Sequence, residues 1–394
     1  MAKKITNVLG VDIGSQMIKV AEVRSQGGQP TISAAGMIAT PEGAVDHTGV
    51  YDSDAVGAAI KQLCGEIGAS APQAVVSVAG QASVLVRTVE VPKMSDDELK
   101  EHMQWEINRN IPFSESTVES DYQAIPPTDP GATNMDVVMA IAPRSAVDTL
   151  VACMRKAGKS AAALDVEPLS LGRDLVQSMG DVLGDETVCV VDFGHKSMSI
   201  NIYRDGNLVL PRTVPVGSEL FTQAIADALQ ISVNDADALK REKGMIPEGV
   251  NPVVMGGSAG PTSEFQAYNP FADEPASAEP AAIEPVAEVS TGDPQSDAIY
   301  RAIAPAVEEV VAEIRRSIDF YRSKGGDVQR ILMCGGGSEL KGLRLYLSKA
   351  LGLNCDVLDP TRRLNVNLRK PQVPLEQHAG EFAVAIGNGL YIFF

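Results

Sequence analysis

The sequence predicts an α/β protein of two similar lobes, on the strength of three observations. First, residues 8–23 align without a gap with residues 188–203, and each copy is an apolar strand ending in Asp-x-Gly, a short polar turn and a second strand. Second, 394 residues exceed what one hydrophobic core usually supports. Third, the glycine-rich turn 335–338 joins an apolar strand to a helical pattern. The repeat is a duplicated β-hairpin unit, so we expect one copy in each of two similar lobes.

Between the two repeats, the patterns predict an inserted subdomain. Helical spacing at 53–68 and a strand at 74–79 continue the first lobe. Ser95 then reads as the N-cap of a helix, because Asp96, Asp97 and Glu98 follow it. Strands at 117–125 and 135–142 and a helix at 144–157 complete an α-β-β-α block.

The second half of the chain contains a compositional anomaly at 244–297. This stretch has eight prolines, nine acidic residues and no lysine or arginine, so we expect a flexible acidic insert. A long helix at 297–324 containing Pro305, a strand at 328–334 and a helix at 339–351 follow. The expected boundaries are 1–92, 159–186 and 376–394 for lobe one, 93–158 for the inserted subdomain, 187–243 and 298–375 for lobe two, and 244–297 for the insert.

Composition excludes several classes of partner. With 33 basic and 51 acidic residues the net charge is −18, which disfavours nucleic acid and anionic lipid. No run of 18 apolar residues occurs and no signal-peptide core precedes Asp12, so we expect a cytoplasmic protein without direct membrane insertion. The five cysteines form no CxxC pair, and we assign them no chemistry. Residues 153–160 end like a Walker A loop, but Cys153 replaces its first glycine and a helix precedes it.

Three turns together predict a nucleotide site. In the first, Asp12-Ile-Gly-Ser-Gln-Met-Ile-Lys19, the glycine lets the backbone approach a phosphate, Ser15 adds a donor, Lys19 a charge, and Asp12 holds Mg²⁺ through water. The repeat copy at 192–197 would face it across a cleft, and the glycines of 335–338 would admit a flat ring or ribose. Each turn alone also fits an ordinary hairpin or strand–helix connection, so the prediction depends on their combination.

The order of these motifs resembles the actin-like ATPase superfamily, whose fold is a duplicated, ribonuclease H-like, two-lobed α/β ATPase. The segments Leu164–Leu171, Ala236–Lys240 and Ala383–Gly389 fall in matching order. Within that superfamily, the inserted subdomain resembles the one shared by FtsA and PilM, and Trp105–Phe113 with Asp121–Gln123 is similar to the PilM family of type IV pilus assembly proteins in particular.

The resemblance implies that ATP and Mg²⁺ bind between the lobes, with Mg²⁺ held through water by Asp12 and Asp192. Asp237 stands where a longer glutamate is usual, and His195 and Lys196 replace small residues, so they would crowd the phosphates or add a charge. The implied nucleotide-binding residues are Asp12, Gly14, Ser15, Gln16, Lys19, Asp192, Gly194, Lys196, Ser197, Asp237, Lys240, Gly335, Gly336, Gly337 and Ser338.

Whether ATP is hydrolysed stays open at this point. Asp165 or Glu167 could orient the attacking water, or both could simply end a strand and cap a turn. The resemblance favours a nucleotide-dependent adaptor with weak or absent ATPase activity over a fast enzyme.

The resemblance also implies a protein partner, the cytoplasmic tail of a PilN-like inner-membrane protein, with pilus motor or platform proteins as further partners. We expect Trp105, Ile111 and Phe113 to line a groove for this tail, with a core role as the alternative. The final residues, 389–394, show no basic amphipathic segment, so recruitment to the inner membrane would be peripheral, through the partner. An FtsA-like polymerising cytoskeletal protein is the alternative function. A small-molecule kinase is a third, although no sugar-binding motif is evident.

Overall fold

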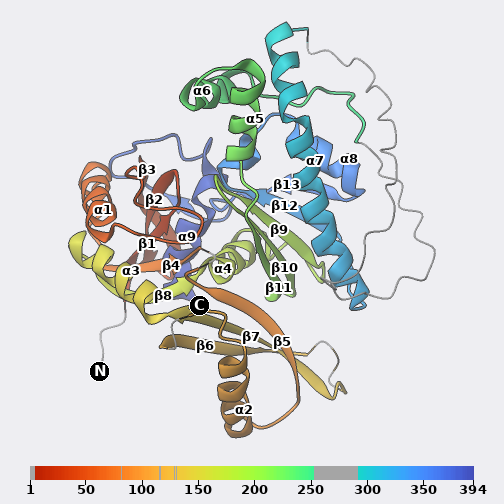
Figure 1. Ribbon diagram of the computed structural model, residues 1–394. Helices are drawn as coiled ribbons and strands as arrows, with labels where there is room; N and C mark the ends of the chain where they lie inside the picture. The colour runs from red at the N-terminus through yellow and green to blue at the C-terminus, as the bar shows by residue number, and fades with distance from the viewer. Residues whose placement is uncertain (1–4, 81, 115–116, 128, 130, 253–291) are drawn as a thin grey trace.

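The computed structural model describes residues 5–80, 82–114, 117–127, 129, 131–252 and 292–394. Two lobes lie side by side, each with its own central sheet, and a third, smaller sheet projects from them (Figure 1). The two-lobed arrangement predicted from the repeat is therefore present.

Lobe one is built on a six-stranded sheet in the order β14-β3-β2-β1-β4-β8. Two apolar clusters cover its faces: α1 and α3 pack on one face, and α9 packs on the other. Its elements are β1 (Asn7–Ile13), β2 (Met17–Gln26), β3 (Gln29–Ala39), α1 (Ser53–Ile67), β4 (Gln73–Val78), α3 (Arg144–Lys156), β8 (Ser160–Val166), β14 (Asn365–Val366) and α9 (Ala383–Gly389).

Lobe two is built on a five-stranded sheet in the order β11-β10-β9-β12-β13. Tyr203 on one face donates to the Pro168 carbonyl at the start of α4 over 2.6 Å, and Arg212 on the other face donates to Ser317 of α7 over 2.8 Å. Its elements are α4 (Glu167–Met179), β9 (Val188–Phe193), β10 (Met198–Arg204), β11 (Asn207–Val214), α5 (Glu219–Leu229), α6 (Val233–Lys243), α7 (Pro294–Ser323), β12 (Arg330–Cys334), α8 (Leu343–Leu351) and β13 (Asn354–Val357).

The sequence repeat is also a repeat of strand pairing. In each lobe the two hairpin strands are antiparallel, and the first of them pairs in parallel with a later strand, β4 or β12. Asp12 lies opposite Lys19 in lobe one, and Asp192 lies opposite Ser199 in lobe two. Lys19 and Ser199 therefore occupy equivalent places.

The inserted subdomain is a three-stranded sheet, β5-β7-β6, covered by α2. Its elements are β5 (Leu85–Pro92), α2 (Asp96–Arg109), β6 (Val118–Ile125) and β7 (Asn134–Pro143). The boundary expected at residue 93 is too late, because β5 pairs with β7 along its whole length. The boundary at 158 is also too late, because α3 buries Leu150, Cys153 and Met154 in the core of lobe one.

Two other boundaries differ from expectation. Helix α4, assigned to lobe one, buries Leu171 and Leu175 in the core of lobe two, since its apolar face meets that sheet. Strand β14, assigned to lobe two, pairs with β3, and Arg369 beyond it forms an ion pair with the buried Glu22 of lobe one. The chain thus passes between the lobes earlier than expected on both occasions.

The edges of the expected flexible insert are ordered. Gly244 caps α6, Ile246 and Val250 are buried, and the Ile246 N–H donates to the Lys341 carbonyl over 2.8 Å. Residues 244–252 are therefore part of lobe two, because their apolar side chains reach its core. The flexibility predicted for 253–291 lies outside the described residues.

Helices α4 and α9 cross between the lobes at glycines. A Cβ at Gly387 of α9 would lie 2.1 Å from the Ser170 carbonyl oxygen of α4, and one at Gly10 of β1 would lie 1.9 Å from that of Ala385. The buried Asn388 amide donates to the Val11 carbonyl and to Ser77, each over 2.9 Å. Only glycine permits this backbone approach, which explains the small residues of 383–389.

Long helices in the described ranges do not resemble membrane spans. Helix α7 continues through Pro305 and has an amphipathic pattern, with one face buried in lobe two. Within those ranges, no helix is both long and apolar enough to cross a bilayer. All five cysteines are buried and unpaired.

Candidate nucleotide-binding site

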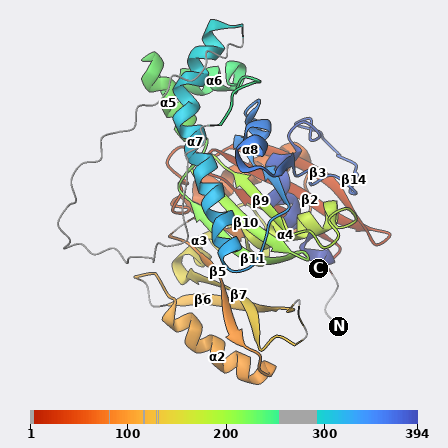
Figure 2. The ribbon, with the colours of Figure 1, turned by 90° about the vertical axis from the view of Figure 1, so that its right-hand side faces the viewer.

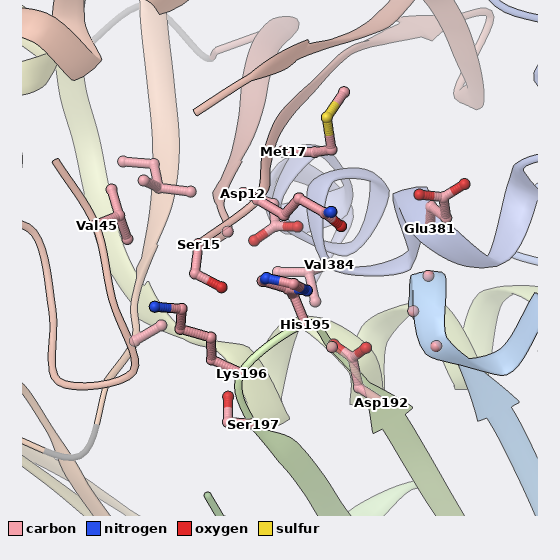
Figure 3. Close-up of a pocket in the computed structure, with 18 of the residues that line it drawn as sticks. Asp12, Ser15, Met17, Val45, Asp192, His195, Lys196, Ser197, Glu381 and Val384 are labelled. Carbon is pink, nitrogen blue, oxygen red and sulfur yellow. The ribbon is translucent and has the colours of Figure 1, made fainter. Parts of the chain in front are cut away.

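A cavity of about 530 Å³ lies between the lobes, and all three predicted turns line it (Figure 3). Asp12 to Met17 come from the turn after β1, and Gly194 to Ser197 come from the turn after β9. Gly335, Gly336 and Gly337 contribute from the turn after β12. Residues far apart in the sequence thus meet in one site, as the three-turn combination predicts.

The two hairpin turns have the same backbone. The Gly14 N–H donates to the Met17 carbonyl over 3.2 Å, and the Gly194 N–H donates to the Ser197 carbonyl over 3.0 Å. A Cβ would lie 2.7 Å from the Met17 oxygen in the first turn and 2.9 Å from the Ser197 oxygen in the second. Glycine is favoured at both positions because a side chain would press on a carbonyl oxygen of its own turn.

Lobe one contributes a paired cation. Lys19 Nζ lies 3.0 Å from Asp12 Oδ2, and both side chains are largely buried. Burial alone would lower the pKa of Lys19, but Asp12, together with Asp192 and Glu381, outweighs burial and raises it. Lys19 is therefore a fixed positive charge in the wall of the cavity, suited to a phosphate.

Lobe two contributes carboxyl groups that share protons. Burial and the nearby Asp192 raise the pKa of Glu167 to about 8, and burial and Asp12 raise the pKa of Asp192 to about 6. Glu167 accepts a hydrogen bond from Ser199, and a side-chain hydrogen bond links it to Asp192. Like charges this close together cannot all ionise, so this wall favours a cation.

These carboxylates fit a hydrated magnesium ion. Mg²⁺ usually keeps several waters and takes one or two protein carboxylates together with substrate phosphates. Asp12 and Asp192 supply such a pair, one from each lobe. In the described ranges, no group of three His, Cys, Asp or Glu side chains is arranged to hold a metal ion, so the protein alone does not form a closed cage.

The glycine-rich turn approaches the lobe two hairpin closely. Gly335 has φ +79°, and a Cβ there would lie 2.1 Å from Asp192 Oδ1. Ser338 donates to the Gly335 carbonyl over 2.6 Å and does not line the cavity, so it braces the turn. The helix expected over 339–351 begins later, at Leu343, and a 3-10 turn, Gly336–Glu339, precedes it.

Helix α6 places one of its two predicted residues in the cavity wall. Lys240 lines the cavity, whereas Asp237 does not. Asp237 is held 2.9 Å from both Lys240 and Arg241, and these cations outweigh its partial burial and lower its pKa. Asp237 therefore positions Lys240, and its shorter side chain stays behind it.

Of the two candidate catalytic carboxylates, only Glu167 faces the cavity. Asp165 forms a buried ion pair with Arg173 and accepts the Val166 N–H over 2.7 Å. Arg173 also donates to the Gly387 carbonyl over 3.0 Å, which ties α4 to α9. The prediction for Asp165 is corrected accordingly, because its carboxylate holds the lobe crossing together and is not exposed to the cavity.

The cavity wall also contains residues that the motifs did not indicate. His378 Nδ1 lies 2.8 Å from Glu381 Oε1, and Glu339 adjoins this pair beside the glycine-rich turn. Burial and Glu381 raise the pKa of Glu339. In the sequence Glu381 lies just before the small-residue motif 383–389. This closeness is the signal that could have predicted its place in the cavity wall.

The cavity continues toward the junction of the inserted subdomain with lobe one. We call this part the apolar arm, because Val, Ala and Leu side chains line it, although Asp46, His47 and Thr149 lie among them. Val45 and Val50 line it from the loop after β3, Val78 from the end of β4, and Ala146 and Leu150 from the first turns of α3. The arm and the part between the lobes form one continuous space.

The predicted groove residues lie elsewhere. Helix α2 covers the side of the small sheet that faces away from the lobes (Figure 1 and Figure 2). Trp105 is 55 % exposed on its outer face, with Arg109 stacked 4.6 Å from the ring centroid. Ile111 and Phe113 pack at the edge of the subdomain core. The prediction that Trp105 lines a groove against lobe one is therefore wrong, because Leu99, Met103 and Ile107 occupy the inward face of α2.

Comparisons with known proteins agree with this architecture. The family described as type IV pilus assembly protein PilM matches residues 10–256, and the family of cell division protein FtsA matches residues 189–387. A solved PilM-PilN type IV pilus biogenesis complex contains a chain that is 25 % identical, with a TM-score of 0.77 and full coverage of both chains.

More distant relatives share less. The ethanolamine utilization protein EutJ from Carboxydothermus hydrogenoformans has a TM-score of 0.54 at 14 % identity, covering 99 % of this chain and 92 % of that one. FtsA from Bacillus subtilis (strain 168) is 27 % identical over 101 residues, which are 26 % of this chain and 22 % of that protein.

The duplicated lobes and the turns that meet between them place this protein in the actin-like ATPase fold class. Within that class, the match over 10–256 is decisive. The chain belongs to the PilM family of type IV pilus assembly proteins.

Proposed function

We propose that this chain is a cytoplasmic adaptor of the type IV pilus inner-membrane platform, which binds Mg-ATP between its lobes and the N-terminal tail of a PilN-like membrane protein. The observation that carries the nucleotide part is the convergence of two Asp-x-Gly turns and a glycine-rich turn on one cavity. The partner part is supported by the similarity to the chain of the PilM-PilN complex. Attachment to the inner membrane would then be peripheral, through PilN.

The cavity supplies the groups that a magnesium nucleotide needs. The N–H groups of two glycine turns can surround phosphates, Lys19 supplies a charge, and Asp12 and Asp192 can hold hydrated Mg²⁺. When bound, the ion would neutralise phosphate charge. The glycines at 335–337 leave room for the nucleoside.

Binding is a better-supported function than hydrolysis. Glu167 is the carboxyl group placed to orient water, but its raised pKa keeps it mostly protonated at neutral pH. A protonated carboxyl group donates a hydrogen bond and does not accept a proton. We therefore assign ATP a structural role and expect turnover to be slow.

The apolar arm is the place for the partner's tail. An extended peptide can place alternate apolar side chains in such a channel while its backbone bonds to a strand or loop edge. Val45, Val50, Val78, Ala146 and Leu150 form the required apolar wall, and the arm leads to the nucleotide cavity. This location replaces the one predicted at Trp105.

Isothermal titration of an N-terminal PilN peptide from the same genome, with and without Mg-ATP, tests both parts. Ala146 is half-buried in the arm, so Ala146→Arg fills it and should weaken peptide binding at least tenfold. Trp105→Ala serves as the matched control on α2 and should leave the affinity unchanged.

The outcomes separate the candidate functions. Peptide affinity that Ala146→Arg lowers and Trp105→Ala does not would support the adaptor. No peptide binding in either state, with ATP-driven sedimentation instead, would replace the adaptor by an FtsA-like filament protein.

A further inference from the structure

His195 is the residue of the cavity that distinguishes the two hairpin turns most clearly. It directly follows Gly194, as Ser15 directly follows Gly14, so the two side chains occupy equivalent places in the two lobes. Figure 3 shows its ring projecting from the turn after β9 into the cavity, toward the turn that carries Asp12 and Ser15.

The imidazole has an unused polar atom. Its side chain is only 18 % exposed, and Nδ1 is buried without a hydrogen-bond partner among the described residues. Nε2 lies 3.7 Å from Glu219 Oε1, too far for a good hydrogen bond. A buried nitrogen without a partner costs free energy in the folded protein, and the ring reaches the cavity through its other atoms.

Backbone contacts hold the turn that carries this ring. The Glu219 N–H donates to the His195 carbonyl over 2.9 Å, and the Ser218 N–H donates to the Gly194 carbonyl over 3.0 Å. A Cβ at Gly217 would lie 2.1 Å from the His195 carbonyl oxygen. The start of α5 therefore holds the turn that carries the ring.

The charges around His195 come from three elements. Glu219 on α5 and Asp237 on α6 favour its protonation, whereas Lys240 on α6 and Lys196 in its own turn oppose it. Burial is the largest influence and lowers the pKa of His195, so the free protein holds a neutral ring at pH 7. An added polyphosphate would shift this balance toward the protonated ring.

We propose that His195 is a direct ligand of the nucleotide's polyphosphate and that ATP binding loads a proton onto its ring. This inference rests on the proposed nucleotide binding. The ring would donate to a phosphoryl oxygen, with one proton taken from solvent, and it would supply in lobe two the charge that Lys19 supplies in lobe one.

The test compares wild type, His195→Asn and His195→Gly by titration with Mg-ATP and with inorganic tripolyphosphate between pH 5.5 and 8. His102→Asn, a histidine substitution on α2 outside the cavity, is the control, and thermal unfolding checks that every variant folds. We expect both His195 variants to bind ATP about tenfold or more weakly at pH 6, since a hydrogen bond to a charged group is lost.

The pH profile separates a ligand from a merely structural residue. Wild-type affinity should rise as pH falls, and titrations in two buffers of different ionisation enthalpy should report proton uptake. The His195 variants should lose that proton uptake. Because the nucleotide titrates equally in both experiments, comparing variant with wild type at the same pH cancels its contribution. Tripolyphosphate should reproduce the effect if the contact is to phosphate.

Three results would overturn the inference. Tighter ATP binding by His195→Gly would show that the ring crowds the phosphates. Unchanged affinity and proton uptake in both variants would make the ring structural, with nucleotide binding itself intact. Absence of ATP binding by wild type at every pH would remove the proposed nucleotide function together with this inference.

Discussion

The turn after β1 and the turn after β9 hold their glycines in the same way, by a hydrogen bond from the glycine N–H to the carbonyl oxygen three residues later. Their side chains differ. In lobe one Asp12 is neutralised by Lys19, whereas in lobe two Asp192 lies beside Glu167 and Ser199 stands in the lysine's place. The duplicated part is thus the backbone, and the two lobes have acquired complementary charges.

This difference suits the unsymmetrical ligand that we propose for the cavity. A magnesium nucleotide presents both negative phosphates and a positive ion. Lobe one offers a fixed cation, and lobe two offers neighbouring carboxyl groups that attract a cation. Substitutions that make the turns more alike, or that remove one side, test this reading.

Lys19→Ser should have the largest effect, because it gives lobe one the residue of lobe two. Asp12 would remain buried without its cation, close to Asp192 and Glu167. Breaking a buried ion pair costs about 3–5 kcal/mol, and Mg-ATP affinity should fall as well. Urea unfolding at pH 7 and ATP titration measure both effects. Ser199→Ala, at the equivalent position, is the control, and an equal loss there would contradict the proposed asymmetry.

Glu167→Gln should change how stability depends on pH. Burial and Asp192 raise the pKa of Glu167 from the ordinary 4.5 to about 8 in the folded protein. Its contribution to the free energy of unfolding is therefore fully present below pH 4.5 and is lost as the pH rises toward 8. The slope is at most about 1.4 kcal/mol per pH unit for one proton. Glutamine cannot ionise, so the variant should gain stability relative to wild type as pH rises. If the free energies of unfolding of wild type and variant changed with pH in the same way across this range, the description of carboxyl groups that share protons would be refuted.

Gly14→Ala and Gly194→Ala should have the smallest and most similar effects. Each Cβ would press on a carbonyl oxygen of its own turn, at 2.7 and 2.9 Å, and relieving that contact should cost about 1 kcal/mol in either lobe. Thermal unfolding of the two variants measures both losses of stability. A clear difference between them would mean that the two backbones are less equivalent than their hydrogen bonds indicate.

Much of this site could be predicted from the sequence because its turns are local patterns. An Asp-x-Gly after an apolar strand defines its own geometry, and the repeat indicates that two such turns face each other. The role of Asp165 could not be predicted, since it depends on Arg173 reaching across from the next helix. The pairing of β14 with β3 gives no pattern in only two residues.

The misplacement of Trp105 had a different cause. Leu99, Met103 and Ile107 already recur at intervals of four, which defines the inward face of α2 and leaves Trp105 opposite. The sequence therefore contained the answer, and the resemblance to a partner-binding family outweighed it. The apolar arm, by contrast, is assembled from the loop after β3, the end of β4 and α3, whose proximity no single segment reveals.

The continuity of the arm with the nucleotide cavity has a consequence for genetics. Val78 ends β4, and its neighbours Ala79 and Gly80 line the same continuous space. If the proposed peptide and nucleotide both bind in this space, a pilus-deficient allele in this stretch would disturb both, and its phenotype could not be assigned to either. Suppressors of such an allele should arise both in the apolar arm and between the lobes. Suppressors of an allele in only one of these two parts should arise in that same part.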